Sequence, residues 1–271
     1  MTSPIKFSLK SSADAASHIA SKVIELCSKK KAAHMGGALS ITDFLSVYYS
    51  FFHIPESSSL FYSKGHACTA LYAALGYFEF FDSKDLESYA DNGSIFTSHV
   101  SHYVPGVELS TGSLGHALSV ASGVSYAKKI ADANHRCFIV LSDGELNEGS
   151  NWEALLFIAH HKLPCTIVID YNQLQSFGRT NEVLNLEPLS NKFEAFNLKC
   201  QVINGHDHLE IFNALSSPDD SPQVIVLNTI KGHPLKYAMN TLESHYYPPS
   251  SDQLTEGLKE IKEHYERHIC N

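Results

Sequence analysis

Several features that would assign a protein to a common functional class are missing from this chain of 271 residues. No apolar run approaches the roughly 20 residues that a membrane-spanning helix needs, and the segment MTSPIKFSLKSS holds no apolar signal core. The net charge of −9 argues against broad nucleic-acid binding, which requires a basic face. We therefore expect a soluble protein with no membrane or nucleic-acid partner.

The cysteines lack the spacing of a metal site. All six are scattered, and no Cys-x-x-Cys or other zinc-binding spacing occurs. Several fall in apolar runs, which indicates buried, reduced thiols and a cytoplasmic location. The glycine fingerprint of nicotinamide-binding domains is missing as well, and this disfavours that fold.

What the chain does contain is an alternation of apolar runs and helical patterns. Strands are predicted at 137–141, 165–170, 200–203 and 223–228, and helices at 12–30, 117–131, 148–161 and 208–215. Ser11 or Ser12 is expected to cap the first helix, and Ser250 or Ser251 a last one. This order predicts an α/β fold, a mostly parallel sheet with helices on both faces. Because no repeat or Pro/Gly/Ser-rich linker divides the chain, we interpret residues 1–271 as a single domain.

Polar residues follow two of the predicted strands. Asp143 comes just after the first apolar run, and Asn172 comes just after the second. Ligands of parallel sheets bind at the carboxyl ends of the strands, so these two side chains are expected to meet. A carboxylate, an amide oxygen and the backbone carbonyl of Leu174 could hold Mg2+, which in turn can clamp a diphosphate beside Gly144. Taken alone, the same residues also fit ordinary strand-end turns.

Asp143 and Asn172 lie in SDGELNEG and DYNQL, which together resemble the thiamine diphosphate signature, GDG followed downstream by Asn. Four further segments, AAHMGGALS, YSKGHACTALYAALG, PGVELSTGSLGHALSVASG and NTIKGHPL, occur in the order found in transketolases and cover roughly residues 15–245. The chain thus resembles the N-terminal, diphosphate-binding half of the transketolase family. This resemblance implies a thiamine diphosphate-binding fold whose cofactor is held through Mg2+, with Ca2+ or Mn2+ as substitutes.

The resemblance also implies roles for single residues. It places His34, His99 and His245 as catalytic residues along the channel to the thiazolium ring. The implied cofactor-binding residues are His66, Gly112, Leu114, Gly144, Glu148, Asn172 and His245, beside the metal ligands Asp143, Asn172 and Leu174. Imidazole suits such a channel because it donates, accepts and titrates near neutral pH. His102 competes with His99, but the spacing to PGVE favours His99.

Five positions depart from the family pattern. Ser142 replaces the first Gly of GDG, Tyr171 an acid, His116 a Gln, Met35 a Pro and Tyr246 a Gly. These changes are expected where substrate enters. They therefore bear on the identity of the sugar more than on the cofactor.

The resemblance further implies that a partner is needed. In the family, a Glu on a second, pyrimidine-binding domain activates the cofactor, and no such domain is found among the 271 residues. We expect one subunit of a split transketolase, which transfers a two-carbon ketol unit from a ketose or ketose phosphate to an aldose. A separate subunit with the pyrimidine-binding and C-terminal domains would complete the site, most simply as an α2β2 assembly.

Two alternatives stay open. The first is a subunit of an acyloin-forming or decarboxylating thiamine diphosphate enzyme, such as deoxyxylulose-phosphate synthase or a dehydrogenase E1 component. The second is a non-catalytic binding or scaffold protein that has kept the fold.

Overall fold

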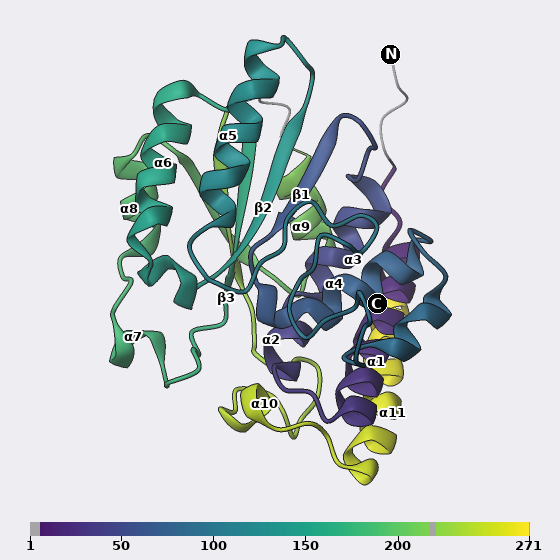
Figure 1. Cartoon of the computed structure of the whole chain (residues 1–271). Coiled ribbons are helices and arrows are strands. Elements are labelled where there is room, and N and C mark those ends of the chain that lie inside the picture. Colours follow the sequence, from purple (N-terminus) through teal and green to yellow (C-terminus); the bar gives the residue numbers. More distant parts are fainter. Residues whose placement is uncertain (1–5, 217–220, 271) are drawn as a thin grey trace.

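A computed structural model of the chain describes residues 6–216 and 221–270 (Figure 1). Its single sheet has five parallel strands in the order β1-β2-β3-β5-β4. The strands are β1 (Ser58–Tyr62), β2 (Arg136–Ser142), β3 (Cys165–Tyr171), β4 (Lys199–Asn204) and β5 (Gln223–Asn228). The predicted parallel α/β sheet is confirmed, and β1 adds an edge strand that the sequence pattern did not predict. The segment expected to lack a signal core lies partly outside the described residues.

Helices cover both faces of this sheet (Figure 1). One face carries α1 (Leu9–Lys30), α2 (Met35–Leu39), α3 (Thr42–Phe51), α4 (Cys68–Tyr77), α9 (His208–Leu215) and α11 (Ser251–Cys270). The other carries α5 (Ala117–Ile130), α6 (Gly149–His161) and α8 (Leu189–Ala195). Alternate residues of β2 serve the two layers, because Phe138 and Val140 pack on the first face and Ile139 and Leu141 on the second.

Short segments connect these elements. They are the 3-10 turns η1 (Gly65–Ala67), η2 (Ser83–Ser88) and η3 (Gly144–Asn147), and the helices α7 (Thr180–Val183) and α10 (Glu243–Tyr246). Among the described residues, no helix combines the length and apolar character that a membrane crossing needs. Five of the cysteines are free thiols, and the side chain of Cys270 lies outside the described part.

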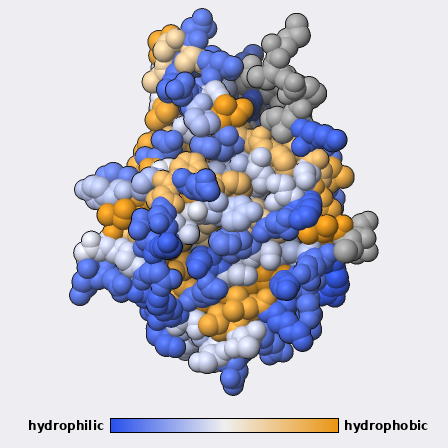
Figure 2. Space-filling view, turned by 90° about the vertical axis from the view of Figure 1, so that its right-hand side faces the viewer, coloured by the Kyte–Doolittle hydropathy of each residue, from blue (hydrophilic) through white to orange (hydrophobic). Residues whose placement is uncertain are grey.

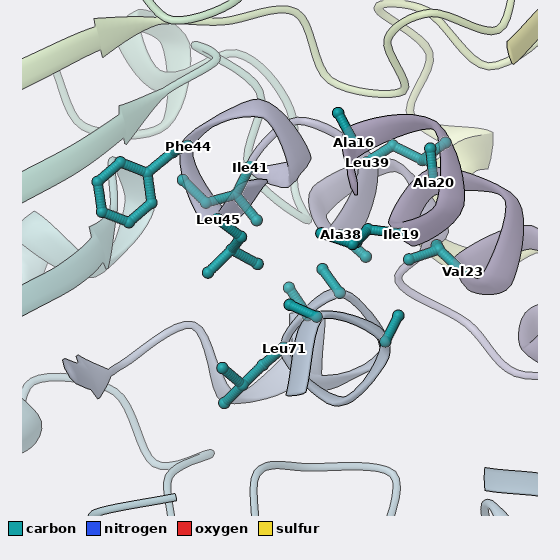
Figure 3. Packing of buried hydrophobic residues seen from close by; sticks show 14 of the residues in the cluster. Ala16, Ile19, Ala20, Val23, Ala38, Leu39, Ile41, Phe44, Leu45 and Leu71 are labelled. Atoms are coloured by element: carbon teal, nitrogen blue, oxygen red, sulfur yellow. The ribbon is translucent and has the colours of Figure 1, made fainter. Parts of the chain in front are cut away.

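The first layer is organised around α1. Its small and branched residues Ala16, Ile19, Ala20 and Val23 pack with Ala38 and Leu39 of α2, Leu45 of α3 and Leu71 of α4 (Figure 3). Full burial of each such Ile or Leu stabilises the fold by about 1.5–3 kcal/mol. The helix begins earlier than predicted, because the Ser8 side chain caps it by accepting from the Ser11 N–H at 3.3 Å. The predicted cap at Ser11 or Ser12 is therefore wrong, and Ser12 is fully buried.

The last helix, α11, packs along α1. Ser250 and Gln253 form a reciprocal cap: the Gln253 N–H donates to Ser250 Oγ at 3.2 Å, and the Ser250 N–H donates to Gln253 Oε1 at 2.9 Å. This confirms Ser250 as the cap. Figure 2 shows the molecule from the right-hand side of Figure 1, where hydrophilic side chains surround smaller apolar patches.

Candidate active site

The strand register brings the predicted polar residues to one edge of the sheet. Ser142 of β2 pairs with Asp170 of β3, and Tyr171 of β3 pairs with Asn228 of β5. The chain therefore leaves three neighbouring strands at adjacent points. A cavity of about 600 Å³ opens there, and its lining includes Asp143, Gly144, Asn172 and Leu174.

Oxygen atoms of the right kind for a hard cation face this cavity. The Asp143 carboxylate is buried and accepts from the backbone N–H of Gly144 at 2.7 Å and of Gln173 at 2.6 Å. Burial, reinforced by the nearby Asp170, raises the pKa of Asp143 to about 6. A buried carboxylate of this kind gains from a neighbouring divalent cation. The Asn172 amide oxygen accepts from the Leu174 N–H at 3.1 Å, so both residues stand in one turn.

A buried ion pair lies next to this turn, because Asp170 comes two residues before Asn172. The Lys64 ammonium pairs with the Asp170 carboxylate, and both side chains are almost fully buried. Lys64 also donates to the Gly37 carbonyl at 2.7 Å, while Ser40 Oγ donates to Asp170 at 2.6 Å and the Thr229 hydroxyl donates to its other oxygen. Burial alone would raise the pKa of Asp170, but Lys64 and the hydroxyl donors hold it below its usual value. The carboxylate therefore stays charged and links β3 to the segments that end at Ser40 and Thr229.

A second lysine lies at the cavity itself. Lys231 Nζ donates to the Leu174 carbonyl at 2.8 Å and lies 3.2 Å from His245 Nδ1. Because an ammonium only donates, His245 Nδ1 is the acceptor and the ring proton sits on Nε2. Burial lowers the pKa of Lys231 to about 8. The charged Lys231 ammonium is thus bonded to the Leu174 carbonyl, which we predicted from the sequence as a metal ligand.

None of the three charged residues of the site, Lys64, Asp170 and Lys231, was assigned a role from the sequence. All three lie in family-like motifs: Lys64 two residues before His66, Asp170 at the end of an apolar run, and Lys231 in the turn after β5. A charged residue bordering a fully buried strand was the signal that could have revealed them.

The structure brings four predicted histidines together, and we call them the cavity histidines: His66 and His245 line the cavity, while His34 and His99 pack beside them. The His34 ring is central, with centroid distances of 5.5 Å to His66, 5.9 Å to His99 and 4.7 Å to His245. His34 has left-handed backbone (φ 68°), and its N–H donates to the His245 carbonyl at 2.7 Å. In contrast, His102 is exposed and bonds Ser110 Oγ at 2.7 Å.

Three of the cavity histidines, His34, His66 and His245, are held in the neutral form. Burial lowers the pKa of His34 to about 4 and that of His245 to about 3, and nearby His99 and Lys231 respectively reinforce the effect. Burial also places the pKa of His66 well below its usual value. At neutral pH each of these rings therefore has one donor and one acceptor nitrogen, which is the complement of a sugar hydroxyl.

Close contacts between loops shape the wall of the cavity. A Cβ at Gly65 would lie 2.5 Å from the backbone of Thr111 and Gly112, and one at Gly112 would lie 3.1 Å from His99 Cδ2. Gly112 and Leu114 both line the cavity, as does Glu148, which is exposed at the start of α6. These three predicted cofactor-binding residues therefore share one wall.

A further acid was not predicted. Glu145 is fully buried, and its Oε1 accepts from the Ser63 hydroxyl and from the Gly115 N–H at 2.8 Å. Burial raises its pKa to about 7. Through these bonds Glu145 fixes the loop of Leu114 and Gly115 against the end of β1.

The residues present fit a metal-bound diphosphate. The cavity offers a carboxylate, an amide oxygen and a carbonyl at its floor, and glycines where a ligand can approach the backbone. In addition, Asn147 Oδ1 and Gln175 Nε2, which belong to lining residues, have no hydrogen-bond partner among the described residues. Buried polar atoms without a partner are costly, so they indicate that a polar ligand completes the site.

Of the five departures from the family pattern, Ser142 lines the cavity directly. Tyr246 lies at its edge, because its hydroxyl donates to the carbonyl of the lining residue Ser176 at 2.6 Å. The Tyr171 hydroxyl bonds Glu187 instead, and His116 is exposed at the start of α5.

The fold and the polar cavity at its strand ends define a cofactor-binding α/β domain. Over residues 11–266 the chain matches the family described as transketolase, thiamine diphosphate binding domain, and it belongs to this family. The family, the fold and the transketolase-type activity expected from the motifs are thereby confirmed, as is thiamine diphosphate as the cofactor.

Relatives with specific names support this assignment. The chain is 37% identical over 213 residues to a relative from Actinobacillus succinogenes that is named as one subunit of apulose-4-phosphate transketolase, covering 77% of each chain. It is 33% identical over 252 residues to 6-deoxy-6-sulfo-D-fructose transketolase subunit SqwG of a Clostridium species, covering 88% of this chain and 92% of the relative. The transketolase structure from Campylobacter jejuni superposes with a TM-score of 0.82 at 27% identity, covering 95% of this chain but 42% of that one.

Proposed function

We propose that this chain is the diphosphate-binding subunit of a split transketolase, which transfers a two-carbon ketol unit from a ketose or ketose phosphate to an aldose. The observation that carries the proposal is the cavity at which Asp143, Asn172 and Leu174 meet the cavity histidines. The subunit names of the relatives support a split enzyme, because these relatives match over most of their own length. They also favour ketol transfer over the acyloin-forming alternative.

In this proposal Asp143, Asn172 and the Leu174 carbonyl hold Mg2+, for which Ca2+ or Mn2+ can substitute. The ion would supply the charge that holds the cofactor diphosphate, and His66, Gly112, Leu114, Gly144 and Glu148, which line the cavity, would contact the rest of the cofactor. The Lys231 ammonium donates to the Leu174 carbonyl, whose oxygen has a second lone pair for the cation, so Lys231 would add positive charge beside the diphosphate. When bound, thiamine diphosphate supplies the thiazolium carbon on which the ketol unit is carried.

The cavity histidines then handle the sugar. His34, His99 and His245 are proposed as catalytic residues that bind sugar hydroxyls and move their protons. The support is their common location together with the low pKa values of His34 and His245, which keep both rings uncharged. An uncharged imidazole can accept a hydroxyl proton on one nitrogen while it donates from the other.

Residues 1–271 are proposed to act as a single cytoplasmic domain that needs a second subunit. That subunit would carry the pyrimidine-binding and C-terminal domains in an α2β2 assembly. The exposed Glu148 at the cavity wall supports this arrangement, because the family resemblance places its counterpart in an acidic network between two cofactor sites.

Two measurements test the proposal. Calorimetry of the chain with its partner is expected to show thiamine diphosphate binding that requires Mg2+ and weakens at least about tenfold in Asp143→Asn, since one charged ligand is lost. Activity is then assayed with apulose 4-phosphate, 6-deoxy-6-sulfofructose and pentose phosphates as donors. Binding without metal dependence would support a scaffold instead, and full ketol transfer by this chain alone would refute the split enzyme.

A further inference from the structure

A second group of histidines lies outside the cavity, around the buried carboxylate of Asp43 on α3. Asp43 Oδ2 bonds His206 Nδ1 at 2.7 Å, and Oδ1 bonds both His208 Nε2 at 3.0 Å and the Tyr265 hydroxyl at 2.8 Å. We call these four residues the Asp43 cluster. Burial alone would raise the pKa of Asp43, but the bonds from His206 and His208 hold it well below its usual range. The carboxylate is therefore charged and accepts three hydrogen bonds.

The orientation of His206 follows from its second partner. Its Nε2 lies 2.9 Å from the backbone nitrogen of Ile230, which can only donate. Nε2 must then be the unprotonated acceptor, and the ring proton sits on Nδ1 and is donated to Asp43. Asp43 thus fixes the tautomer that lets His206 hold the Ile230 amide.

A metal ion does not explain this cluster. Asp43, His206 and His233 do have potential ligand atoms within 4.8 Å of one another. However, the His206 and His233 rings are stacked, with centroids 3.8 Å apart and planes 26° apart. Imidazole binds metals in the plane of its ring, so two stacked rings do not point at one ion. The Ile230 amide also occupies the His206 nitrogen that faces away from Asp43.

Ile230 lies between two residues of the candidate active site. The hydroxyl of Thr229 donates to Asp170, and Lys231 Nζ reaches the Leu174 carbonyl and His245. The backbone of this turn is held elsewhere by the Thr229 N–H on the Tyr171 carbonyl at 3.3 Å and the Gly232 N–H on the Gly36 carbonyl at 2.9 Å. His206 supplies the bond at its centre.

We propose that His206, oriented by Asp43, is a positioning residue that fixes the 229–232 turn and thereby sets Lys231 against the cofactor cavity. The geometric part of this proposal is independent of the cofactor, while its consequence for binding rests on the proposed function. His208 provides a matched control. It bonds the same carboxylate and is more deeply buried, but its other nitrogen bonds Ser12 Oγ at 2.8 Å on α1, away from the turn.

The test compares His206→Phe with His208→Phe by amide hydrogen exchange of the chain without cofactor. Phe keeps a ring against His233 in the first variant and removes one bond to Asp43 in both. We expect exchange at Ile230 to become about five- to tenfold faster in His206→Phe, since one amide loses its acceptor, and to stay unchanged in His208→Phe relative to global stability. Equal acceleration of this amide in both variants, or in neither, overturns the proposal.

Two further variants keep the test decisive if His206→Phe folds poorly. In Asp43→Asn the amide oxygen would face His208 and Tyr265, which are two donors, and its NH2 group would face His206. His206 would then switch tautomer and oppose the Ile230 N–H, so this variant should also accelerate exchange at Ile230. His206→Gln, which can still accept from Ile230, should retain protection. If Asp43→Asn leaves the amide protected, the role assigned to Asp43 is wrong.

The functional consequence is measured separately. In the assembled enzyme, His206→Phe should weaken Mg2+-dependent cofactor binding about tenfold with a smaller change in kcat, because a displaced Lys231 alters the floor of the site. His208→Phe should leave the affinity unchanged. Faster exchange at Ile230 without any change in cofactor affinity would support the role of His206 in holding the turn. It would contradict the assignment of the cavity as the cofactor site.

Discussion

The molecule contains two groups of histidines that differ in what satisfies them. In the Asp43 cluster each ring nitrogen of His206 and His208 has a protein partner, and a carboxylate accepts from both rings. Around the cavity, no carboxylate is bonded to the described rings of His34, His66 or His245, and the charges that lower their pKa values are cationic or imidazole groups. We call His206 and His208 the closed group, because their ring nitrogens are all bonded within the protein. We call the cavity histidines the open group, because they can still bind a ligand.

This contrast shows that chemistry depends on the partners of a residue and not on its type. A carboxylate beside an imidazole fixes its proton and orientation, which suits a support for the fold. Burial of neutral rings without such a partner costs free energy unless a polar ligand bonds to their nitrogens. This arrangement suits a binding channel. If the contrast holds, substitutions in the Asp43 cluster change stability and the geometry of the 229–232 turn, whereas substitutions of the cavity histidines reduce activity directly.

The largest expected effect is on stability, in Asp43→Ala. This change leaves three buried donors, from His206, His208 and Tyr265, without their acceptor, and it should lower the free energy of unfolding by about 3–5 kcal/mol. Urea denaturation followed by circular dichroism measures the loss. Asp14→Ala serves as the control, because its pair with Lys10 is exposed and screened by solvent and therefore contributes little to stability. Similar losses in the two variants would show that the Asp43 cluster is not a structural support.

The second prediction concerns the open group, in His245→Ala. We expect kcat of the assembled enzyme to fall about 100-fold, as when a general acid or base is removed, while the free energy of unfolding changes by less than about 1 kcal/mol. The His34 N–H bond to the backbone carbonyl of residue 245 is kept in this variant. His160→Ala, at an exposed position of α6, is the control for activity. A His245→Ala enzyme that is unstable but catalytically normal would reverse the comparison.

Local motifs were sufficient to predict the open group. His34, His66 and His99 each stand in a short segment of characteristic sequence, and the strand-end rule placed Asp143 and Asn172 together from the order of the apolar runs alone. For residues in such segments, the neighbouring sequence alone is enough to predict a location in the site. The role of each cavity residue in binding or catalysis stays a prediction, although their common location is established.

Packing between layers could not be predicted in the same way. Lys64 and Asp170 are 106 positions apart, and the bonds of Asp43 to His206 and Tyr265 span 163 and 222 positions. The helices predicted from the sequence do not include α8, because its seven residues bury only Leu189 and Phe193 and so show too little periodicity. The cap at Ser8 was missed because the apolar stripe becomes visible only further along α1.

The third prediction is a difference in pH dependence. The pKa values of His34 and His245, about 4 and about 3, lie below the value of about 6.5 in an unfolded chain. The unfolded state therefore binds more protons in this window. Their contribution to stability is fully present above about pH 6.5 and is lost as the pH falls towards the folded values.

Urea denaturation between pH 7 and pH 5 measures this effect. The free energy of unfolding should decrease with falling pH. Replacing His34 and His245 by Phe should make this slope smaller, by an amount that corresponds to up to about one bound proton per histidine. The Asp43 contribution behaves differently. Because the pKa of Asp43 in the folded protein lies well below its usual value, this contribution is present above the unfolded pKa of about 4 and is lost only as the pH falls below it. An unchanged slope in the double variant would show that His34 and His245 are not held neutral by the fold.

The smallest expected effect separates two neighbouring histidines. His102 lies on the surface against Tyr103 and Ser110, whereas the His99 ring packs beside His34 and behind the cavity-lining Gly112. His102→Ala should change the activity of the assembled enzyme less than about twofold and the stability by less than about 0.5 kcal/mol, as for an exposed side chain. His99→Ala should reduce activity at least about tenfold at similar stability. A larger loss of activity from His102→Ala would contradict this assignment. It would mean that the loop at 100–112 moves when the partner binds and brings the His102 side chain into the site in place of His99.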